Sequence, residues 1–366
     1  MTLRSVSRSS VSRLAALIAG PLLLIGGALW LSACQSQSDE QDASGREAGG
    51  PSGAVSGLFE PLPDEAPVSE DESPVTKAKI NLGHKLYFEP KLSRSGTISC
   101  NTCHVVGAAG VDHRKVAIGE GARKGPRNSP TVYNAAYLAS QFWDGRAATL
   151  KEQAKGPIQA HVEMDLTKDE AVARLQETGY KPLFDEAFPK ADTALTFDHI
   201  AEAIATFEKT LTTPGAPFDR YLEGDTDALS PKQKAGLEMF VNSGCAGCHR
   251  GAMLGGQGYA KFSHVEGKGD IGRAKVTGKK SDEYTFRIPS LRNVAKTYPY
   301  FHDGSAKTLE EAVSIMGEAQ LGRTFNEKEV DKLVAFLKSL TGNFPNVPYP
   351  NLPREPTPPS GSGTSK

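Results

Sequence analysis

The apolar residues of this chain recur at helical rather than strand spacing over most of its length. After Thr196, apolar positions follow the i, i+4, i+7, i+11 pattern of one helical face: Ile200, Ile204, Phe207 and Leu211. A second stripe ends before Gly342 and consists of Val330, Leu333, Val334, Leu337 and Leu340. Such stripes predict helices that pack one face against a core.

Capping patterns predict where further helices begin. A Thr or Asn followed three residues later by Glu is typical of a helix N-terminus, and it occurs at Thr149 and Glu152, Thr167 and Glu170, Thr308 and Glu311, and Asn326 and Glu329. Ser73 and Pro74 predict the start of one more helix, with Leu82 and Leu86 on one face. No segment alternates with period two, so the sequence predicts a mainly α fold with little sheet.

The N-terminal residues 1–33 have the pattern of a secretion signal. Arg4, Arg8 and Arg13 precede an apolar run over residues 14–31, and small residues then lead to Cys34. This junction resembles a bacterial lipobox, which would make Cys34 the acylated first residue of the mature protein. The alternative is a membrane-spanning anchor. We expect a periplasmic protein held at a membrane through its lipid, and Gln35 after the cysteine favours the outer membrane.

Charge is distributed unevenly along the 366 residues. The whole chain carries 42 basic and 43 acidic side chains, but residues 35–74 hold ten acids and one base. Residues 75–366 therefore have 38 bases and 33 acids. Residues 34–74 read as an acidic flexible linker and residues 357–366 as a disordered tail. The composition excludes collagen and coiled coils, and no strongly basic field points to nucleic acid.

Two pentapeptides carry the chemistry: Cys100 to His104 and Cys245 to His249, both with the pattern Cys-x-x-Cys-His. In this pattern the thiols of Cys100 and Cys103, or of Cys245 and Cys248, each add to a haem vinyl group, and the following histidine binds the iron. A single such motif could also be a redox dithiol or half a zinc site. Two motifs in an exported chain predict two covalently bound haem c groups.

The chain repeats itself at an offset of 159 residues. Residues 143–152 match residues 302–311, and the same offset pairs Pro130 with Pro289 and Asn134 with Asn293. It also pairs Pro157 with Met316. A thioether can bind the sixth position of haem iron and raise its potential, whereas proline cannot bind iron. We expect Met316 to close the second, high-potential haem and the first haem to stay open; a core methionine is the alternative.

The ordered set of motifs resembles the bacterial dihaem cytochrome c peroxidases from about Leu82 to Gly342. The resemblance rests on both haem motifs, on Met316, and on residues 125–130, 141–146, 162–164 and 300–304. It implies two cytochrome-c-like domains from an internal duplication. We place the peroxidatic, low-potential haem domain at residues 75–213, joined by the C-terminal segment 344–356, and the electron-transfer domain at residues 214–343.

The same resemblance implies reduction of hydrogen peroxide with electrons from a small cytochrome c or cupredoxin. Glu163 matches the acid–base carboxylate of the family, and Gln153 matches a pocket amide that orients peroxide. Without the resemblance, Glu163 would read as a solvated acid. His161 is the rival for the proton role on residue type alone.

Three further features follow from the resemblance. Trp143 matches an aromatic side chain between the two haems, although core packing is the ordinary role of a tryptophan. Asn128, Thr297 and Pro299 match a calcium site at the domain junction, which supplies hard oxygen ligands. Asn128 is otherwise simply a turn residue. Family members are commonly homodimers.

Two other functions stay open. One is a MauG-like dihaem oxidase that acts on protein tryptophan residues; its pattern has tyrosine where Met316 stands. The other is a non-catalytic dihaem electron carrier, which would need both irons closed.

One loop departs from the family pattern. Many members carry a histidine 16 residues after the first motif histidine, and it caps the resting ferric iron. Glu120 stands at that position here. His113 could take the place of that histidine, but its surroundings favour a solvated loop residue. Glu120 itself is interpreted either as a labile ligand of the iron or as an exposed acid. We expect an open first haem that needs no reductive activation.

Overall fold

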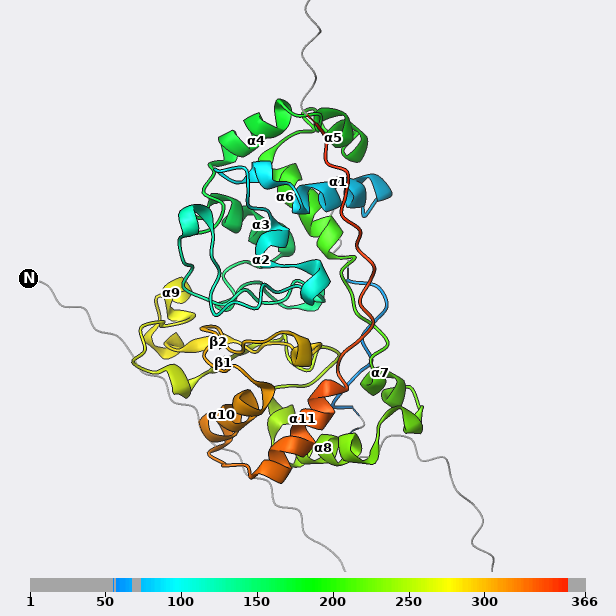
Figure 1. Ribbon diagram of the computed structural model, residues 1–366, viewed down its shortest axis with the longest axis vertical. Helices are drawn as coiled ribbons and strands as arrows, with labels where there is room; N and C mark the ends of the chain where they lie inside the picture. Colours follow the sequence, from blue (N-terminus) through cyan, green and yellow to red (C-terminus); the bar gives the residue numbers. More distant parts are fainter. Residues whose placement is uncertain (1–54, 56, 68–73, 355–366) are drawn as a thin grey trace, which may run out of the picture. The chain divides into compact units, whose positions relative to one another are not determined.

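Helices make up most of the secondary structure (Figure 1). The computed structural model describes residues 55, 57–67 and 74–354, all within one compact unit, Ala48–Lys366. The helices are α1 (Lys77–Tyr87), α2 (Cys100–Cys103), α3 (Leu150–Gln159), α4 (Lys168–Gln176), α5 (Lys181–Ala187), α6 (Phe197–Glu208), α7 (Pro217–Leu222), α8 (Pro231–Asn242), α9 (Ala274–Thr277), α10 (Leu309–Leu321) and α11 (Glu327–Lys338). Within these ranges the strands are β1 (Tyr259–Lys261) and β2 (Thr285–Arg287), paired antiparallel. The mainly α prediction is confirmed.

The predicted helix starts are confirmed at four capping sites. Thr149, Thr167, Thr308 and Asn326 are the N-caps of α3, α4, α10 and α11, and each side chain accepts a hydrogen bond from the backbone N–H three residues on. α6 likewise begins after Thr196. This agreement follows from the local nature of capping, which needs only neighbours in sequence.

Two predicted helix boundaries are wrong. The first helix begins at Lys77 rather than at Ser73 and Pro74, because the Thr76 side chain caps it by accepting from the Lys79 N–H. α11 ends at Lys338 instead of continuing to Gly342. Gly342 serves a tertiary contact: a Cβ built on it would lie 1.9 Å from the Thr213 carbonyl oxygen.

Two hydrophobic cores organise the described residues. The first lies among α1, α3, α4, α5 and α6, and the second among α7, α8, α10 and α11. In each, a glycine lets two helices touch: a Cβ on Gly83 of α1 would lie 1.8 Å from the Ala203 carbonyl oxygen on α6, and one on Gly236 of α8 would lie 2.0 Å from the Lys332 carbonyl oxygen on α11. Any larger side chain would push these helix pairs apart.

The 159-residue repeat appears as repeated backbone geometry. Asn134 and Asn293 both adopt the left-handed conformation, at φ of 61° and 60°, and both donate from Nδ2 to the hydroxyl of Thr213, at 2.7 and 2.8 Å. Phe142 and Phe301 match in the same way, with φ of 68° and 70°. The two halves therefore meet at Thr213, which lies at the end of the first.

Both ends of the described chain pack against a core. The segment after α11 runs back along α1 toward α5 (Figure 1), and Phe344, Val347 and Leu352 contact the first core. The predicted flexible linker needs correction in part, because Val55, Phe59 and Leu62 are at most 5% exposed and the first two belong to the second core. No helix in the described ranges has both the length and the apolar character needed to cross a membrane. The predicted signal segment, Cys34 and the tail at residues 357–366 lie outside the described residues.

Candidate haem centres and active site

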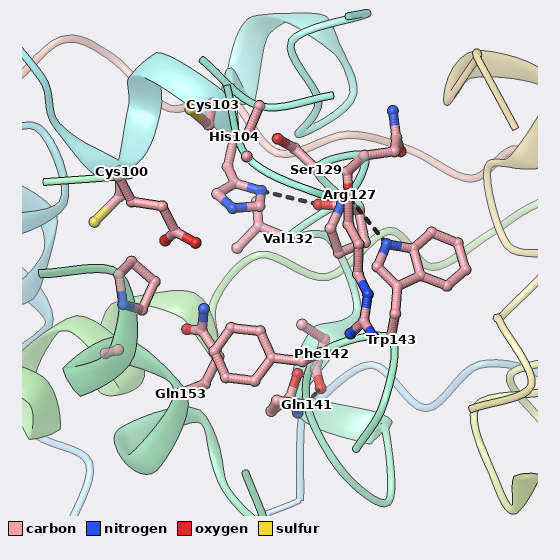
Figure 2. A pocket seen from close by; sticks show the side chains of 18 of the residues that line it. Cys100, Cys103, His104, Arg127, Ser129, Val132, Gln141, Phe142, Trp143 and Gln153 are labelled. Carbon is pink, nitrogen blue, oxygen red and sulfur yellow. Dashed lines mark hydrogen bonds between the residues drawn. The ribbon is translucent and has the colours of Figure 1, made fainter. Parts of the chain in front are cut away.

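The first haem motif lines a cavity of about 440 Å³. Cys100 and Cys103 lie on α2, and His104 follows directly, so one short turn brings both thiols and the imidazole to the same wall. Figure 2 shows these residues facing Trp143 and Gln153 across the cavity. Burial raises the pKa of both thiols, that of Cys103 to about 11, which argues against a reactive dithiol.

The His104 imidazole is held for metal binding through its far nitrogen. Its Nδ1 lies 2.8 Å from the Pro130 carbonyl oxygen, an acceptor that requires the proton on Nδ1 and leaves the Nε2 lone pair free. Burial lowers the pKa of His104, which favours the neutral imidazole that binds iron.

The second motif lines a separate cavity of about 300 Å³ with the same arrangement. Cys245, Cys248 and His249 all contribute to its wall, and His249 is 8% exposed. Its Nδ1 lies 3.0 Å from the Leu254 carbonyl oxygen, so Nε2 is again the free nitrogen. Among the described residues, the four motif cysteines form no disulfide.

The two cavities differ at the positions that the repeat pairs. Pro157, near the C-terminal end of α3, lines the first cavity, and Met316, on α10, lines the second. Met253 is buried and also lines the second cavity, so this wall holds two thioethers, those of Met253 and Met316. Proline therefore stands in the first cavity where the repeat places Met316 in the second, although the buried Met164, which follows α3, also lines the first cavity.

The predicted acid–base carboxylate, Glu163, and the predicted peroxide-orienting amide, Gln153, lie in the first cavity. Glu163 and Gln153 both line it, and Glu163 is only partly exposed. Burial raises the pKa of the Glu163 carboxyl, while Arg146 opposes that rise. His161, the rival, is exposed, pairs with Asp165 at 3.2 Å and is not among the residues that line the cavity.

Sequence reasoning missed another carboxyl in this cavity, beside those of Glu163 and Asp144. Glu208, the last residue of α6, is 6% exposed and lines the cavity, and burial raises its pKa to about 8. A signal existed, because Glu208 follows Ile200 and Ile204 at i+4 spacing on the apolar face of the helix.

Trp143 lies in the wall that the two cavities share. Its indole N–H donates to the Asn128 carbonyl at 2.9 Å, and its ring lies edge-on to His302. This position is compatible with the predicted electron path between the cavities, which stays a prediction.

Asn128 joins the two halves of the molecule. Its backbone N–H donates to the His302 carbonyl at 2.7 Å, and its Nδ2 donates to the Arg114 carbonyl at 2.8 Å, which leaves its side-chain oxygen for another partner. Thr297 and Pro299 line the second cavity together with Asn128. Within the described ranges, no three His, Cys, Asp or Glu side chains gather as a metal-binding group.

The two candidate caps of the first iron point elsewhere. Glu120 is 5% exposed, and its carboxylate accepts from the Ser95 N–H at 2.8 Å and the Ser95 hydroxyl at 2.7 Å. Burial opposes ionisation, but hydrogen bonds from Ser95 and Ser93 together with the charge of Arg123 outweigh it and lower the pKa of Glu120. The expectation of an exposed acid is therefore wrong, and Glu120 does not line the cavity. His113 stacks on Tyr298 at 4.1 Å and bonds its carbonyl at 2.9 Å, so it is not a free loop residue.

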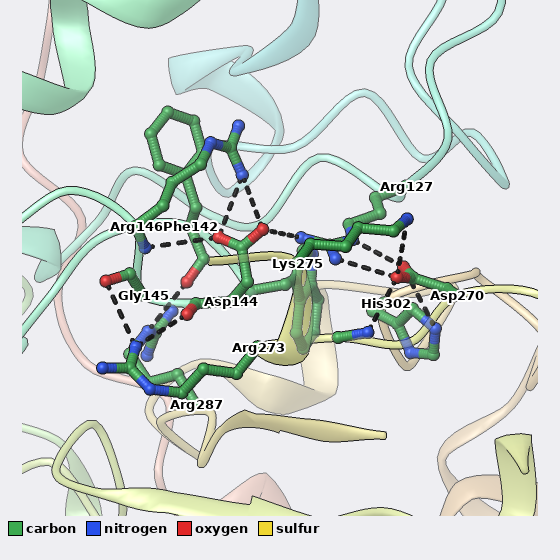
Figure 3. Close-up of polar contacts among 12 residues, drawn as sticks. Arg127, Phe142, Asp144, Gly145, Arg146, Asp270, Arg273, Lys275, Arg287 and His302 are labelled. Carbon is green, nitrogen blue, oxygen red and sulfur yellow. Dashed lines mark hydrogen bonds and ion pairs between the residues drawn. The ribbon is translucent and has the colours of Figure 1, made fainter. Parts of the chain in front are cut away.

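A cluster of charged side chains adjoins the first cavity (Figure 3). Arg127 bonds Asp144 at 2.6 Å and Asp270 at 2.7 Å, and thereby links the two halves of the chain. Arg146 also pairs with Asp144, and Lys275 with Asp270. Arg127, Arg146 and Lys275 line the first cavity.

The residues present fit two haem groups. Each cavity has two unoxidised thiols three residues apart and an imidazole with its Nε2 free, and the shared wall holds a buried arginine, Arg287, whose Nη1 has no partner within the described structure. Haem supplies vinyl groups for the thiols, iron for the imidazole and anionic propionates for an arginine.

Comparison with known proteins agrees with this arrangement. Residues 77–227 match the di-haem cytochrome c peroxidase family, and residues 233–341 match the cytochrome c family. The chain is 49% identical over 309 residues to the cytochrome c551 peroxidase of Pseudomonas aeruginosa, covering 82% of this chain and 88% of that one. It is 46% identical over 288 residues to the cytochrome c551 peroxidase of Nitrosomonas europaea, covering 77% and 85%.

A solved structure supports the same fold. The crystal structure of a MauG-like protein associated with microbial copper homeostasis superimposes with a TM-score of 0.69 at 28% identity, covering 77% of this chain and 93% of that one. Two cytochrome-c-like domains, each with a haem c motif, are thus present in one chain. The chain belongs to the di-haem cytochrome c peroxidase family and is a peroxidase.

Proposed function

We propose that this enzyme reduces hydrogen peroxide to two waters in the periplasm, with two electrons from a small cytochrome c or cupredoxin and two protons. The observation that carries the proposal is the asymmetry of the cavities: Glu163 and Gln153 line the first, and Met316 lines the second. The name of the Pseudomonas aeruginosa relative, cytochrome c551 peroxidase, is consistent with a cytochrome donor.

Each cavity has a separate task in this proposal. Haem iron supplies the redox chemistry of both sites. In the first cavity, Gln153 orients peroxide by hydrogen bonding, and Glu163 moves a proton from the near to the far oxygen. Its raised pKa suits this task, because an acid–base group works best when its pKa approaches the working pH. Met316 would hold the second iron through its thioether, and Trp143 would lie on the electron path between the cavities.

The proposal includes an open first iron. Pro157 offers no ligand, Ser95 holds the Glu120 carboxylate, and Tyr298 holds His113. The fully ferric enzyme should therefore react with peroxide without prior reduction. A low-spin bis-histidine spectrum of the first haem that is lost in His113→Ala would contradict this.

The test of the acid–base role is Glu163→Gln in the holoenzyme, which keeps the size of the side chain and removes the proton carrier. Peroxide-dependent oxidation of reduced cytochrome c should fall by about 10² or more. Glu186→Gln is the matched control, because Glu186 is an exposed acid on α5. Near-normal turnover of the Glu163 variant would overturn its assignment.

We also propose a calcium ion at the junction of the halves, held by the Asn128 side-chain oxygen and the carbonyl oxygens of Thr297 and Pro299. The free Asn128 oxygen and the place of all three residues in one wall support it. Removal of calcium with a chelator should lower turnover reversibly, and Asn128→Ala should make turnover insensitive to added calcium.

The location and assembly complete the proposal. We expect acylation at Cys34, attachment to the outer membrane by that lipid alone, and a homodimer. Membrane fractionation of the wild type, compared with Cys34→Ser, tests the anchor. Light scattering of the Cys34→Ser protein, purified without detergent, tests the dimer. Wild-type protein in the soluble periplasmic fraction would refute the anchor.

The structural neighbour with a MauG-like title raises a dihaem oxidase as the second candidate. That alternative expects tyrosine at the position of Met316, whereas a thioether lines the second cavity here. Spectra of the ferric and half-reduced forms report the sixth ligand of each iron and separate the two functions.

A further inference from the structure

Arg287 is a buried guanidinium to which the proposed peroxide chemistry gives no role. It ends β2, is 4% exposed, and donates from its backbone N–H to the Trp143 carbonyl at 2.8 Å. Its Nε makes one long contact, 3.3 Å, to the Phe142 carbonyl oxygen. Its Nη1 is buried without a partner among the described residues. The strand therefore holds Arg287 against the backbone of Phe142 and Trp143, and Trp143 lines the same two cavities as Arg287.

The neighbouring acids are all engaged with other cations. Asp144 pairs with Arg127 and Arg146, and Asp270 pairs with Arg127 and Lys275. No carboxylate in the described structure pairs with Arg287, and burial lowers its pKa to about 10. A buried charge without a counter-ion is costly, so the site is complete only with an anion.

The location of Arg287 indicates which anion this is. Haem carries its vinyl groups on one edge and its two propionates on the opposite edge. Cys245 and Cys248, which take the vinyl edge, line only the second cavity, whereas Arg287 lies in the wall that both cavities share. Planar guanidinium binds carboxylate through paired hydrogen bonds.

Among the arginines that line the second cavity, Arg287 is the one with a guanidinium nitrogen that lacks a hydrogen-bond partner in the described structure. Arg292 lines it too, but its guanidinium bonds Asp219 at 2.6 Å, the Ala252 carbonyl at 2.7 Å and the Glu60 carbonyl at 3.3 Å. The first cavity, by contrast, has Arg127, Arg146 and Lys275 in its wall. In the second cavity, Arg287 is thus the cation available to pair with the propionates of the haem.

We propose that Arg287 Nη1 binds a propionate of the haem in the second cavity and acts as a positioning residue that holds this haem edge beside Trp143. The inference rests on the two bound haems and not on the peroxide chemistry. A fixed positive charge beside the haem favours the reduced iron, so Arg287 also raises the potential of the haem that takes up electrons.

The experiment is a spectroelectrochemical titration of the holoprotein without peroxide, which separates this inference from the proposed function. Arg287→Gln should shift the equilibrium between ferrous and ferric iron in the second haem about tenfold toward ferric, which lowers its reduction potential by about 59 mV. The potential of the first haem should change less. Arg287→Lys should recover part of the shift, because it keeps the charge but not the planar fork. Arg220→Gln, an exposed arginine paired with Asp225, is the control.

Three results would overturn the proposal: an unchanged potential of the second haem in Arg287→Gln, a shift confined to the first haem, or Arg287→Lys no closer to wild type than Arg287→Gln. If Arg287→Gln fails to load haem, resonance Raman spectra of Arg287→Lys decide. Propionate bending modes of the second haem that differ from wild type support the contact, and identical modes refute it.

Discussion

The contact of Thr213 with both halves of the chain can be tested by one isosteric substitution. Its hydroxyl accepts from Asn134 and from Asn293, and its backbone N–H donates to the Asn134 side-chain oxygen at 2.9 Å. All three residues are 1% exposed. Thr213→Val keeps the shape and the backbone bond but removes the acceptor of two buried amide N–H groups.

The expected loss follows from these two groups. An unsatisfied buried donor costs about 1–3 kcal/mol, so two cost about 2–6 kcal/mol. The added methyl group returns about 0.8 kcal/mol of burial. The free energy of unfolding should therefore fall by about 1–5 kcal/mol, and peroxidase turnover should fall with it at temperatures near the unfolding midpoint.

Urea unfolding of the holoprotein, followed by far-ultraviolet circular dichroism, measures this loss. Thr210→Val is the matched control, because Thr210 is exposed and its hydroxyl donates only to the Phe207 carbonyl; its change should stay within about 0.5 kcal/mol. If Thr213→Val unfolds at the same urea concentration as the control, the shared contact does not stabilise the molecule.

Three further predictions concern the haem cavities. Met316→His should lower the potential of the second haem, because imidazole favours ferric iron more than thioether does; an unchanged potential would exclude Met316 as a ligand. Glu120→Ala should cost about 1–3 kcal/mol of stability by freeing the Ser95 N–H, and the ferric spectrum of the first haem should not change. Glu208→Gln should stabilise the protein more at pH 8 than at pH 5 in unfolding experiments. Because the pKa of Glu208 is raised to about 8 in the folded state, the free energy of unfolding of the wild type falls as the pH rises from about 4.5 toward 8. A gain that is equal at both pH values would contradict this.

The sequence by itself determined the features that depend on neighbours along the chain. Caps such as Thr149 and Thr308 satisfy backbone groups three residues away, and apolar stripes such as that after Thr196 need only helical periodicity. The haem motifs are equally local, because two thiols and an imidazole lie within five residues. The internal repeat required only self-comparison, and the matched conformations of Asn134 and Asn293 agree with it.

Tertiary structure decided the features that depend on distant segments. Phe59 lies in an acidic, Pro-rich stretch, yet it packs against Phe218 at 5.4 Å in the second core. Composition averages over such a stretch and does not show where one aromatic ring docks. Glu120 turned out to be buried because Ser95, on another loop, supplies two donors to its carboxylate.

The roles of Glu208 and Arg287 also depend on segments that are distant in the sequence. Each is an isolated charged residue in the sequence, and its meaning depends on which cavity its helix or strand borders. Burial and the lack of a counter-ion are properties of the surrounding fold, because residues far apart in the chain set the local polarity. Local spacing therefore specified the helices and the haem attachment motifs, whereas only the packed structure showed which charged residues line the two cavities.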